Sequence, residues 1–371
     1  MHILIFIAVI VALIVVHEFG HFVAAKLSGM RVDEFGLGYP PRALTLGKIG
    51  ETRYTLNWLP FGGFVKIHGE DGEGKDDPHS FAARPRILQA IVLAAGVTMN
   101  LLFAYVLITA ALVAGTPRAL VPSDLATAKS VELAVANVLP GSPAAHAGLL
   151  PADSIMSAKD ATGVWSPSGS PGTGITDPKS FSAFVAASRG ATITLEVKRD
   201  GQEQSIVATP AAGLIVSDPT RYALGVEVAT IGVVPLSLGA ALTSGASLTW
   251  ETTVLTAKGL THFFYGIFTF SADLSQVAGP VGIVGAVGSA SAQGFGDLLS
   301  IMAIISINLA LINLIPIPAL DGGRLLFVLI EGVTRRPIKL SVARTMNAIS
   351  FAFLILLMVV VTAHDIFRIV G

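Results

Sequence analysis

The sequence predicts a polytopic α-helical membrane protein with a membrane re-entrant β-hairpin and one extracytoplasmic α/β domain. Of its 371 residues, 52% are hydrophobic and 13% are charged, whereas soluble domains carry about 25% charged residues. Four apolar segments are long enough to cross roughly 30 Å of hydrocarbon, at about residues 3–25, 87–114, 298–317 and 348–362. A polar region with strand and helix patterns separates the second segment from the third.

A cleaved signal peptide is the alternative interpretation of the first segment. No Lys or Arg precedes its apolar run, the run is longer than a signal sequence needs, and no small-residue cleavage motif stands before Lys26. We therefore expect a retained helix.

Lys and Arg residues near the apolar segments indicate the orientation. They gather in the loops 26–86 and 320–346, whereas the opposite flanks carry only Arg118 and Arg368 close to a segment. Because cytoplasmic loops are enriched in Lys and Arg, these two loops are expected in the cytoplasm. Both termini and the polar region then face the other side.

The first cytoplasmic loop carries a strand pattern. Residues 51–70 alternate between apolar and polar side chains around the pair Gly62-Gly63, which predicts a β-hairpin that dips toward the membrane. Backbone is tolerated at that depth only where it is buried in protein or lines a wet cavity.

The polar region reads as a small α/β domain between residues 131 and 209. Residues 131–138 alternate like a strand, the stretch SPAAHAGL resembles a short helix, and a hairpin is predicted with its turn at Asp200-Gly201. The Gly-, Pro- and Ser-rich segment from Ser166 to Gly174 is expected to be a loop.

Residues 235–270 are apolar but interrupted by Glu251, Lys258 and His262, which predicts helical pieces in the membrane interface. The chain is thus expected to divide into four regions. Residues 1–115 hold the first two spans with the β-loop, and residues 121–230 hold the extracytoplasmic domain with its linkers. Residues 231–296 form the interfacial segment, and residues 297–371 hold the last two spans.

Composition excludes several classes of partner and chemistry. The net charge is -1 and no basic stripe is present, so nucleic acid is not an expected partner. The absence of Cys removes thiolate ligands and cysteine nucleophiles. Any metal site must therefore use His and carboxylate side chains.

The first apolar segment contains His17-Glu18-Phe19-Gly20-His21, an HExxH motif. An ionised group in hydrocarbon costs about 2.5–3.5 kcal/mol, a cost that a bound dication would offset. On a helix the two His lie one turn apart on the same face and can share one metal ion, and nitrogen and oxygen ligands favour zinc. Glu18 projects from an adjacent direction, where it can take a proton from a metal-bound water.

A catalytic zinc usually has a third protein ligand and one open position. The candidate is Asp321 in the stretch NLIPIPALDGGR, where Pro316 and Pro318 break the helix and two glycines permit close packing. A helix-capping role fits the residues alone equally well. Asparagines in membrane helices more often join helices than act on substrates, so packing is the favoured role for the polar and small residues Asn308, Asn313, Gly96 and Asn100.

The HExxH motif, the glycine-rich β segment, GVTMN in the second span, the α/β domain and NLIPIPALDGG together resemble the site-2 protease family of intramembrane zinc metalloproteases. The likeness extends over essentially the whole chain and is strongest to the bacterial members that regulate sigma-E. It implies zinc bound by His17, His21 and Asp321, with Glu18 as general base. It also implies that Asn313 and Asn308 hold the substrate backbone, and that the α/β domain is a PDZ domain.

The same resemblance implies an intramembrane protease of the bacterial inner membrane, with a periplasmic PDZ domain. Its substrates would be single-span membrane proteins, such as an anti-sigma factor or remnant signal peptides, cleaved after an upstream periplasmic protease has trimmed them. The hairpin edge around Gly62, Gly63, Phe64 and Val65 is expected to hold an unwound substrate as an added strand.

Three features depart from the family pattern. The chain has one PDZ-like domain where some relatives have two, Pro151-Ala152-Asp153 stands where Gly-Asp is common, and Gly96-Val97 stands where Gly-Pro is common.

Two other functions remain as alternatives. A membrane-anchored PDZ binding module with structural zinc would need four ligands, and three are found. An ion transporter would be expected to show an inverted repeat, and none is seen.

Overall fold

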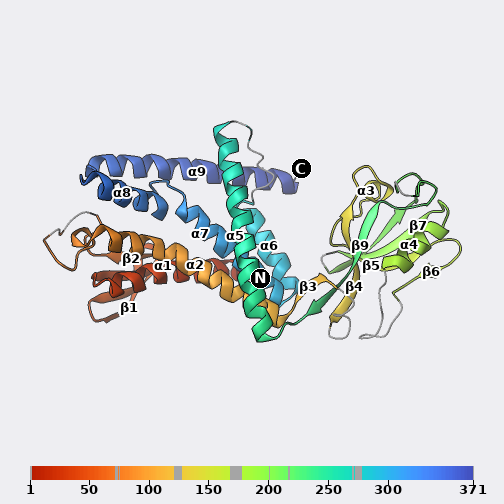
Figure 1. Cartoon of the computed structure of the whole chain (residues 1–371), viewed down its shortest axis with the longest axis horizontal. Helices are drawn as coiled ribbons and strands as arrows, with labels where there is room; N and C mark the ends of the chain where they lie inside the picture. The colour runs from red at the N-terminus through yellow and green to blue at the C-terminus, as the bar shows by residue number, and fades with distance from the viewer. Residues whose placement is uncertain are drawn as a thin grey trace. The chain divides into compact units, whose positions relative to one another are not determined.

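The computed structural model describes residues 2–71, 74, 76–120, 128–167, 178–199, 201–215, 218–269, 271 and 278–370. These residues form two compact units (Figure 1). The first combines Met1–Ala110 with Leu242–Gly371, and the second is Ala111–Ala241. Each unit is described by itself.

Four helices of the described chain are long and apolar enough to cross a membrane, as predicted. They are α1 (His2–Leu27), α2 (Arg86–Ala114), α7 (Phe295–Leu314) and α9 (Leu340–Val370). The apolar stretch of α9 runs from Leu340 to Phe367, so this helix is much longer than the expected 348–362. Helix α7 ends at Leu314, shortly before the two prolines that deny its backbone further donors.

Two shorter helices also belong to the first unit. Helix α6 (Pro280–Gln293) packs against both α1 and α7. Their shared apolar core includes Val9, Leu13 and Val287. Helix α8 (Asp321–Thr334) follows α7 after a short irregular turn and lies within the loop expected at 320–346. Its first residue is therefore the candidate third ligand.

The expectation of separate helical pieces within 235–270 is wrong, because α5 (Leu238–Phe268) is one continuous helix of 31 residues. Glu251, Lys258 and His262 are all exposed. They are spaced by seven and four residues, so they share one face of a helix and do not interrupt it. Threonine hydroxyls on the helix hydrogen-bond to carbonyls one turn earlier, as from Thr253 to Thr249 at 2.7 Å, so these polar side chains find their partners within the helix itself.

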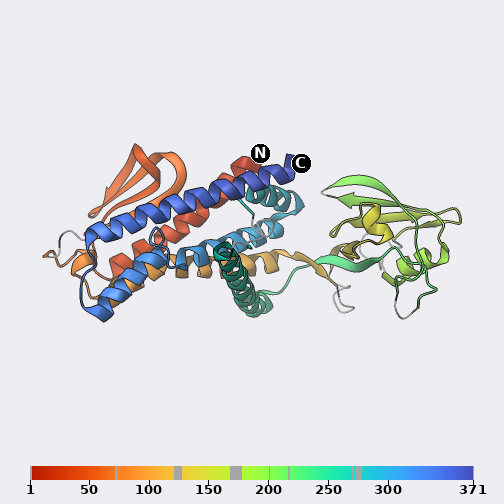
Figure 2. The same cartoon turned by 90° about the horizontal axis from the view of Figure 1, so that it is seen from above.

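The segment between α1 and α2 forms a sheet of two long strands, β1 (Val32–Ile49) and β2 (Thr52–Ile67), shown in orange and red in Figure 2. The expected hairpin within 51–70 is wrong, since that stretch is a single strand whose partner precedes it. Pro40 and Pro41, with the glycines of β1, obscure the strand pattern there. Gly62 and Gly63 lie within β2 and not in a hairpin turn.

The two halves of β2 flank the beginning of β1. Glu34 is paired with both Arg53 and Lys66, and Leu37 with both Leu56 and Gly63. The segment 63–67 therefore has β1 on one side and no paired strand among the described residues on the other. Strand β2 also packs along α1, which places this free edge beside the helix that carries HExxH.

The second unit is a sheet with the strand order β3-β9-β4-β5-β7-β8, with β6 beside β5. Its strands are β3 (Thr116–Ala119), β4 (Lys129–Val138), β5 (Ser154–Lys159), β6 (Val164–Trp165), β7 (Ile193–Arg199), β8 (Gln202–Ala208) and β9 (Val226–Val234). Helices α3 (Pro143–His146) and α4 (Pro178–Ala187) complete it.

The strand at 131–138, the short helix and the hairpin predicted in this region are all present. Asp200, in the predicted turn, and residues 168–174 of the predicted loop lie outside the described residues. Phe181 from α4 joins Leu133, Ile193 and Leu195 from the strands in a fully buried core. The chain reaches and leaves the unit on adjacent strands, because β3 pairs with β9.

Candidate metal centre

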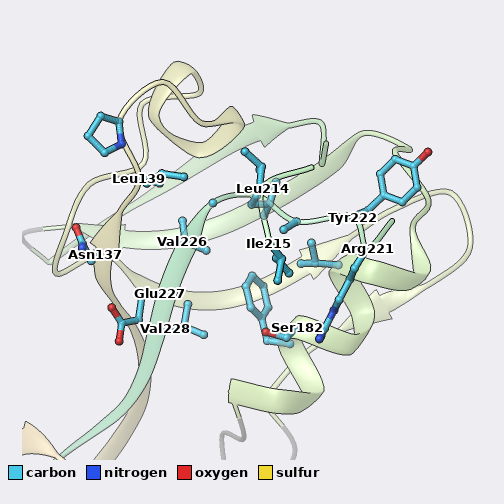
Figure 3. Close-up of a pocket in the computed structure, with 16 residues that line it drawn as sticks. Asn137, Leu139, Ser182, Leu214, Ile215, Arg221, Tyr222, Val226, Glu227 and Val228 are labelled. Carbon is cyan, nitrogen blue, oxygen red and sulfur yellow. The ribbon is translucent and has the colours of Figure 1, made fainter. Parts of the chain in front are cut away.

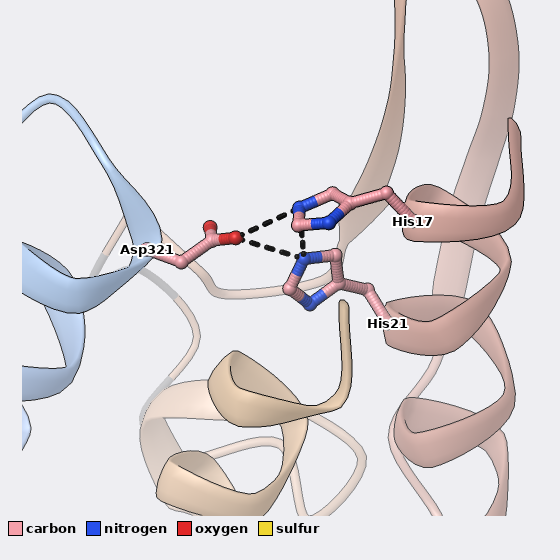
Figure 4. A group of neighbouring side chains, drawn as sticks. All are labelled: His17, His21 and Asp321. Atoms are coloured by element: carbon pink, nitrogen blue, oxygen red, sulfur yellow. Dashed lines mark hydrogen bonds and ion pairs between the residues drawn. The ribbon is translucent and has the colours of Figure 1, made fainter. Parts of the chain in front are cut away.

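The two histidines of the first helix and the carboxylate that begins α8 converge on one point (Figure 4). His17 Nε2 lies 2.9 Å from Asp321 Oδ2, His21 Nε2 lies 3.2 Å from the same oxygen, and the two Nε2 atoms are 3.2 Å apart. Both histidines are buried. Within the described residues, these side chains are the one group of three with metal-ligand spacing.

The donor set and its spacing fit zinc. Two ligand atoms about 2.0–2.1 Å from one tetrahedral zinc lie about 3.3 Å apart, close to the sides of the observed triangle. Two imidazole nitrogens and one carboxylate oxygen are ligands that zinc accepts. A fourth position is left for water or substrate, which is the pattern of a catalytic site.

Residues of helix α2 contact the Nδ1 atoms of both imidazoles. His21 Nδ1 donates to the backbone carbonyl of Val92 at 2.8 Å, which is the hydrogen bond that lets a neutral ring present its Nε2 lone pair to a metal. His17 Nδ1 lies 3.2 Å from the side-chain Nδ2 of Asn100. Val92 and Asn100 are eight residues apart, two turns along the same face of α2.

Gly96 lies between these two residues on the same face. A Cβ atom there would come within 2.7 Å of His17 Cε1 and 2.8 Å of His17 Nε2, and nearer still to His21 Nε2. Gly20, inside the HExxH motif, lets α2 approach, since its Cβ would lie 2.5 Å from the Ala95 carbonyl oxygen. The close contact of the two helices therefore depends on glycine from each.

The packing role that the sequence favours for Gly96 and Asn100 does not include their closeness to the candidate metal site. Both lie against the candidate metal ligands. The available signal was the spacing of GVTMN, in which glycine and asparagine stand four residues apart and share a face, as the two histidines do.

Asp321 is held by a tight connection between α7 and α8. A Cβ on Gly322 would clash with the backbone of Leu314, and one on Gly323 with the backbone of Ile317. The cap position of α8 is Leu320, and the Asp321 carboxylate turns toward the histidines. Burial raises the pKa of the Asp321 carboxyl, but its hydrogen bonds with His17 and His21 lower it more, so the group is a carboxylate at neutral pH.

A cavity of about 390 Å³ adjoins two of the candidate ligands, His21 and Asp321. It is lined by Glu18, His21, Gly63, Phe64, Val65, Lys66, Ile67, Glu70, Asp71, Val92, Leu93, Asp321 and Arg324. The free edge of β2 passes directly beside Glu18, because a Cβ on Gly63 would lie 3.3 Å from Glu18 Cγ. An ion pair of 2.6 Å between Arg324 and Glu70 joins α8 to the end of β2.

The other residues singled out in the sequence differ in position. Gly63, Phe64 and Val65 line the cavity, whereas Gly62, Asn308 and Asn313 are absent from its described lining. Asn308 is half-buried and donates to the Ile304 carbonyl of its own helix at 3.1 Å. The substrate-binding roles expected for these residues stay predictions.

The second unit contains a separate groove of about 380 Å³ between α4 and β9 (Figure 3). Phe181, Ser182 and Val185 form one wall, and Val226 and Val228 form the other. Strand β3 pairs only with residues 231–234 of β9. Residues 226–229 of β9 are therefore paired with β4 alone among the described strands.

Comparison with known proteins places the whole chain in one family. Residues 5–357 match the model of peptidase family M50. A Nostoc protein whose name assigns it to the zinc metalloproteases is 36% identical over 345 residues, which cover 91% of this chain and 88% of the relative. Zinc metalloprotease RasP of Oceanobacillus iheyensis is 26% identical, with 98% of each chain covered. Membrane metalloprotease ARASP of Arabidopsis thaliana, a chloroplastic protein, is 30% identical over 88% of this chain and 70% of its own length.

Proposed function

The chain belongs to peptidase family M50, and from that premise we propose that it is an intramembrane protease, which hydrolyses a peptide bond within or near the membrane-spanning segment of single-span proteins. It is a zinc metalloprotease, as its relatives are named. The observation that carries the proposal is the place of HExxH. His17 and His21 lie on α1, whose apolar stretch of 25 residues is long enough to cross the membrane.

The proposed roles follow from the geometry of the site. His17, His21 and Asp321 would hold the zinc, and Glu18 lines the adjoining cavity. A zinc ion bound there would acidify a water molecule and polarise the scissile carbonyl. Glu18 takes the proton of the attacking water and returns it to the leaving amine as the peptide bond breaks.

A substrate helix must unwind before it is cut, because its carbonyls are occupied by its own hydrogen bonds. The free edge of β2 at residues 63–67 can take up such a segment as an added strand. This pairing satisfies the backbone groups that unwinding releases inside the membrane. From the family resemblance, Asn313 and Asn308 are proposed to hold the substrate backbone near the zinc.

The decisive experiment compares cleavage of a single-span model substrate by wild-type protein and by Glu18→Gln, with zinc measured in both. We expect cleavage to be lost and zinc to be retained. Asp71→Asn is the matched control, because Asp71 lines the same cavity and is exposed to solvent. Cleavage that survives Glu18→Gln would assign the activity to another group or to a contaminant.

Location and substrates are proposed from the sequence. The bias of Lys and Arg toward residues 26–86 and 320–346 supports a cytoplasmic position for these loops and an extracytoplasmic one for the second unit. We place the protein in the bacterial inner membrane, with this unit and both termini in the periplasm. An anti-sigma factor or remnant signal peptides, trimmed first by a periplasmic protease, are the proposed substrates.

A second function is favoured by the groove of the second unit. Its free β9 edge beside α4 has the form of a strand-addition site, which supports the assignment of a PDZ domain. We propose that this domain keeps substrates with bulky outer parts from the membrane site.

The size-filter role is testable because β3 and β9 are paired. Ala119 lies opposite Ile231, so residues 120–230 can be replaced by a short glycine linker. Cleavage of untrimmed substrate should then appear, whereas an unchanged size limit would contradict the role. Ser182→Trp, which fills the groove but keeps the domain, separates exclusion by bulk from exclusion through a bound peptide.

A further inference from the structure

The amide of Asn100 is unusual because one of its ends has no partner. Asn100 has 0% of its surface exposed. Its Nδ2 lies 3.2 Å from His17 Nδ1, whereas its Oδ1 is buried with no hydrogen-bond donor among the described residues. A buried acceptor without a donor is destabilising, so this amide invites a functional explanation.

The present contact fits one tautomer of His17. If Asn100 donates from Nδ2, His17 Nδ1 must accept, and the ring proton is then on Nε2. That proton is directed at Asp321 Oδ2, 2.9 Å away. In this tautomer zinc cannot bind through Nε2, since an Nε2 that carries a proton has no lone pair for the metal.

Zinc binding through Nε2 requires the other tautomer. The proton must then be on Nδ1, where metal-binding histidines nearly always donate to an oxygen acceptor. His21 already meets this condition through the Val92 carbonyl. Beside His17, the described oxygen that can do so is Asn100 Oδ1, once the amide has turned by half a rotation about its last bond.

We propose that Asn100 is a positioning residue of the zinc centre, and that its Oδ1 accepts the Nδ1 proton of His17 and so presents the Nε2 lone pair to the metal. The inference rests on the proposed role of His17 as a ligand. It differs from a packing role because a side chain of equal size without an acceptor would not replace asparagine.

The test measures zinc affinity of the full-length protein by competition with a chelator. Asn100→Leu keeps the volume but removes the acceptor, and we expect zinc to bind about 10- to 100-fold more weakly. Asn100→Asp keeps an acceptor in place, and its affinity should equal or exceed that of wild type. Ser306→Ala is the matched control, because Ser306 Oγ donates to the Asn100 backbone carbonyl at 2.8 Å in the same buried helix contact.

Each outcome decides between the roles. Unchanged zinc affinity in Asn100→Leu overturns the inference. An equally large loss of zinc affinity in Ser306→Ala and Asn100→Leu also overturns it, because helix packing would then be the cause. If the leucine variant does not fold, the aspartate variant still decides, because a tenfold loss there contradicts an acceptor role. His17→Ala tests the underlying assignment separately. Zinc that binds His17→Ala as tightly as wild type would refute the ligand role itself.

Discussion

Gly96→Ala adds one methyl group at the point where α2 meets the two histidines. That methyl carbon would lie 2.7–2.8 Å from two atoms of the His17 ring. Ordinary carbon contacts begin near 3.4 Å, so the His17 ring or the helix must retreat by about 0.6–0.7 Å, and the nearer His21 Nε2 must move further. A misplacement of about 1 Å at a catalytic centre costs up to about 10²-fold in rate. We therefore expect a loss of one to two orders of magnitude in turnover, together with weaker zinc binding.

The same substitution should not destabilise α2 by itself, because alanine is about 0.8–1.0 kcal/mol more favourable than glycine inside a helix. This separates damage to the site from damage to the fold. Turnover and zinc content are measured with the single-span substrate, and thermal unfolding is followed in parallel. Gly259→Ala in α5 is the matched control, since a Cβ there meets nothing within 4 Å. Wild-type zinc affinity and turnover in Gly96→Ala would refute the close contact on which this reasoning depends.

Three further predictions concern the strand edge and the second unit. Val65→Pro removes a backbone donor from the free edge of β2 and should reduce turnover more than zinc content; equal losses in the two assays would argue against a substrate-binding edge. Ala152 adopts φ +73°, where a side chain costs about 1–2 kcal/mol. Ala152→Gly removes this cost but gives the unfolded chain more freedom, so the net stabilisation of the second unit should be about 0.5–1 kcal/mol. Hydrogen exchange of the core strands of the unit measures it. Burial raises the pKa of the Asp153 carboxyl, but Arg199 at 2.7 Å and the Leu150 N–H lower it more, so that the pKa lies below its ordinary value. That stabilisation is present above the unfolded pKa of about 3.9 and is lost as the pH falls through the folded value. Asp153→Asn should therefore lower the free energy of unfolding by about 3 kcal/mol at pH 7, and the two proteins should become equally stable in acid. A difference in stability that stays constant across pH would contradict the ion pair.

The spans and the ligand-bearing motif could be predicted because their signals are local. Length and apolarity identify a membrane helix, and the i, i+4 spacing of His17 and His21 requires only that α1 be helical. The second unit was predictable for the same reason, since its strands alternate and its turns carry glycine.

Features that depend on contacts between distant segments were not predictable. Asp321 fitted a ligand and a helix cap equally well until the fold placed it beside α1. Strand β1 was missed because Pro40 and Pro41 break its pattern, although pairing with β2 on both sides compensates for them. The role of Gly96 depends on what lies opposite it, and a single sequence does not state which helix that is.

The separation of 304 positions between His17 and Asp321 has a consequence for biosynthesis. At ribosomal rates of about 5–20 residues per second, Asp321 emerges roughly 15–60 s after His17. Throughout that interval the nascent chain carries the two histidines and Glu18 without the third ligand. The proposed ligand set is therefore complete only when nearly the whole chain has been made.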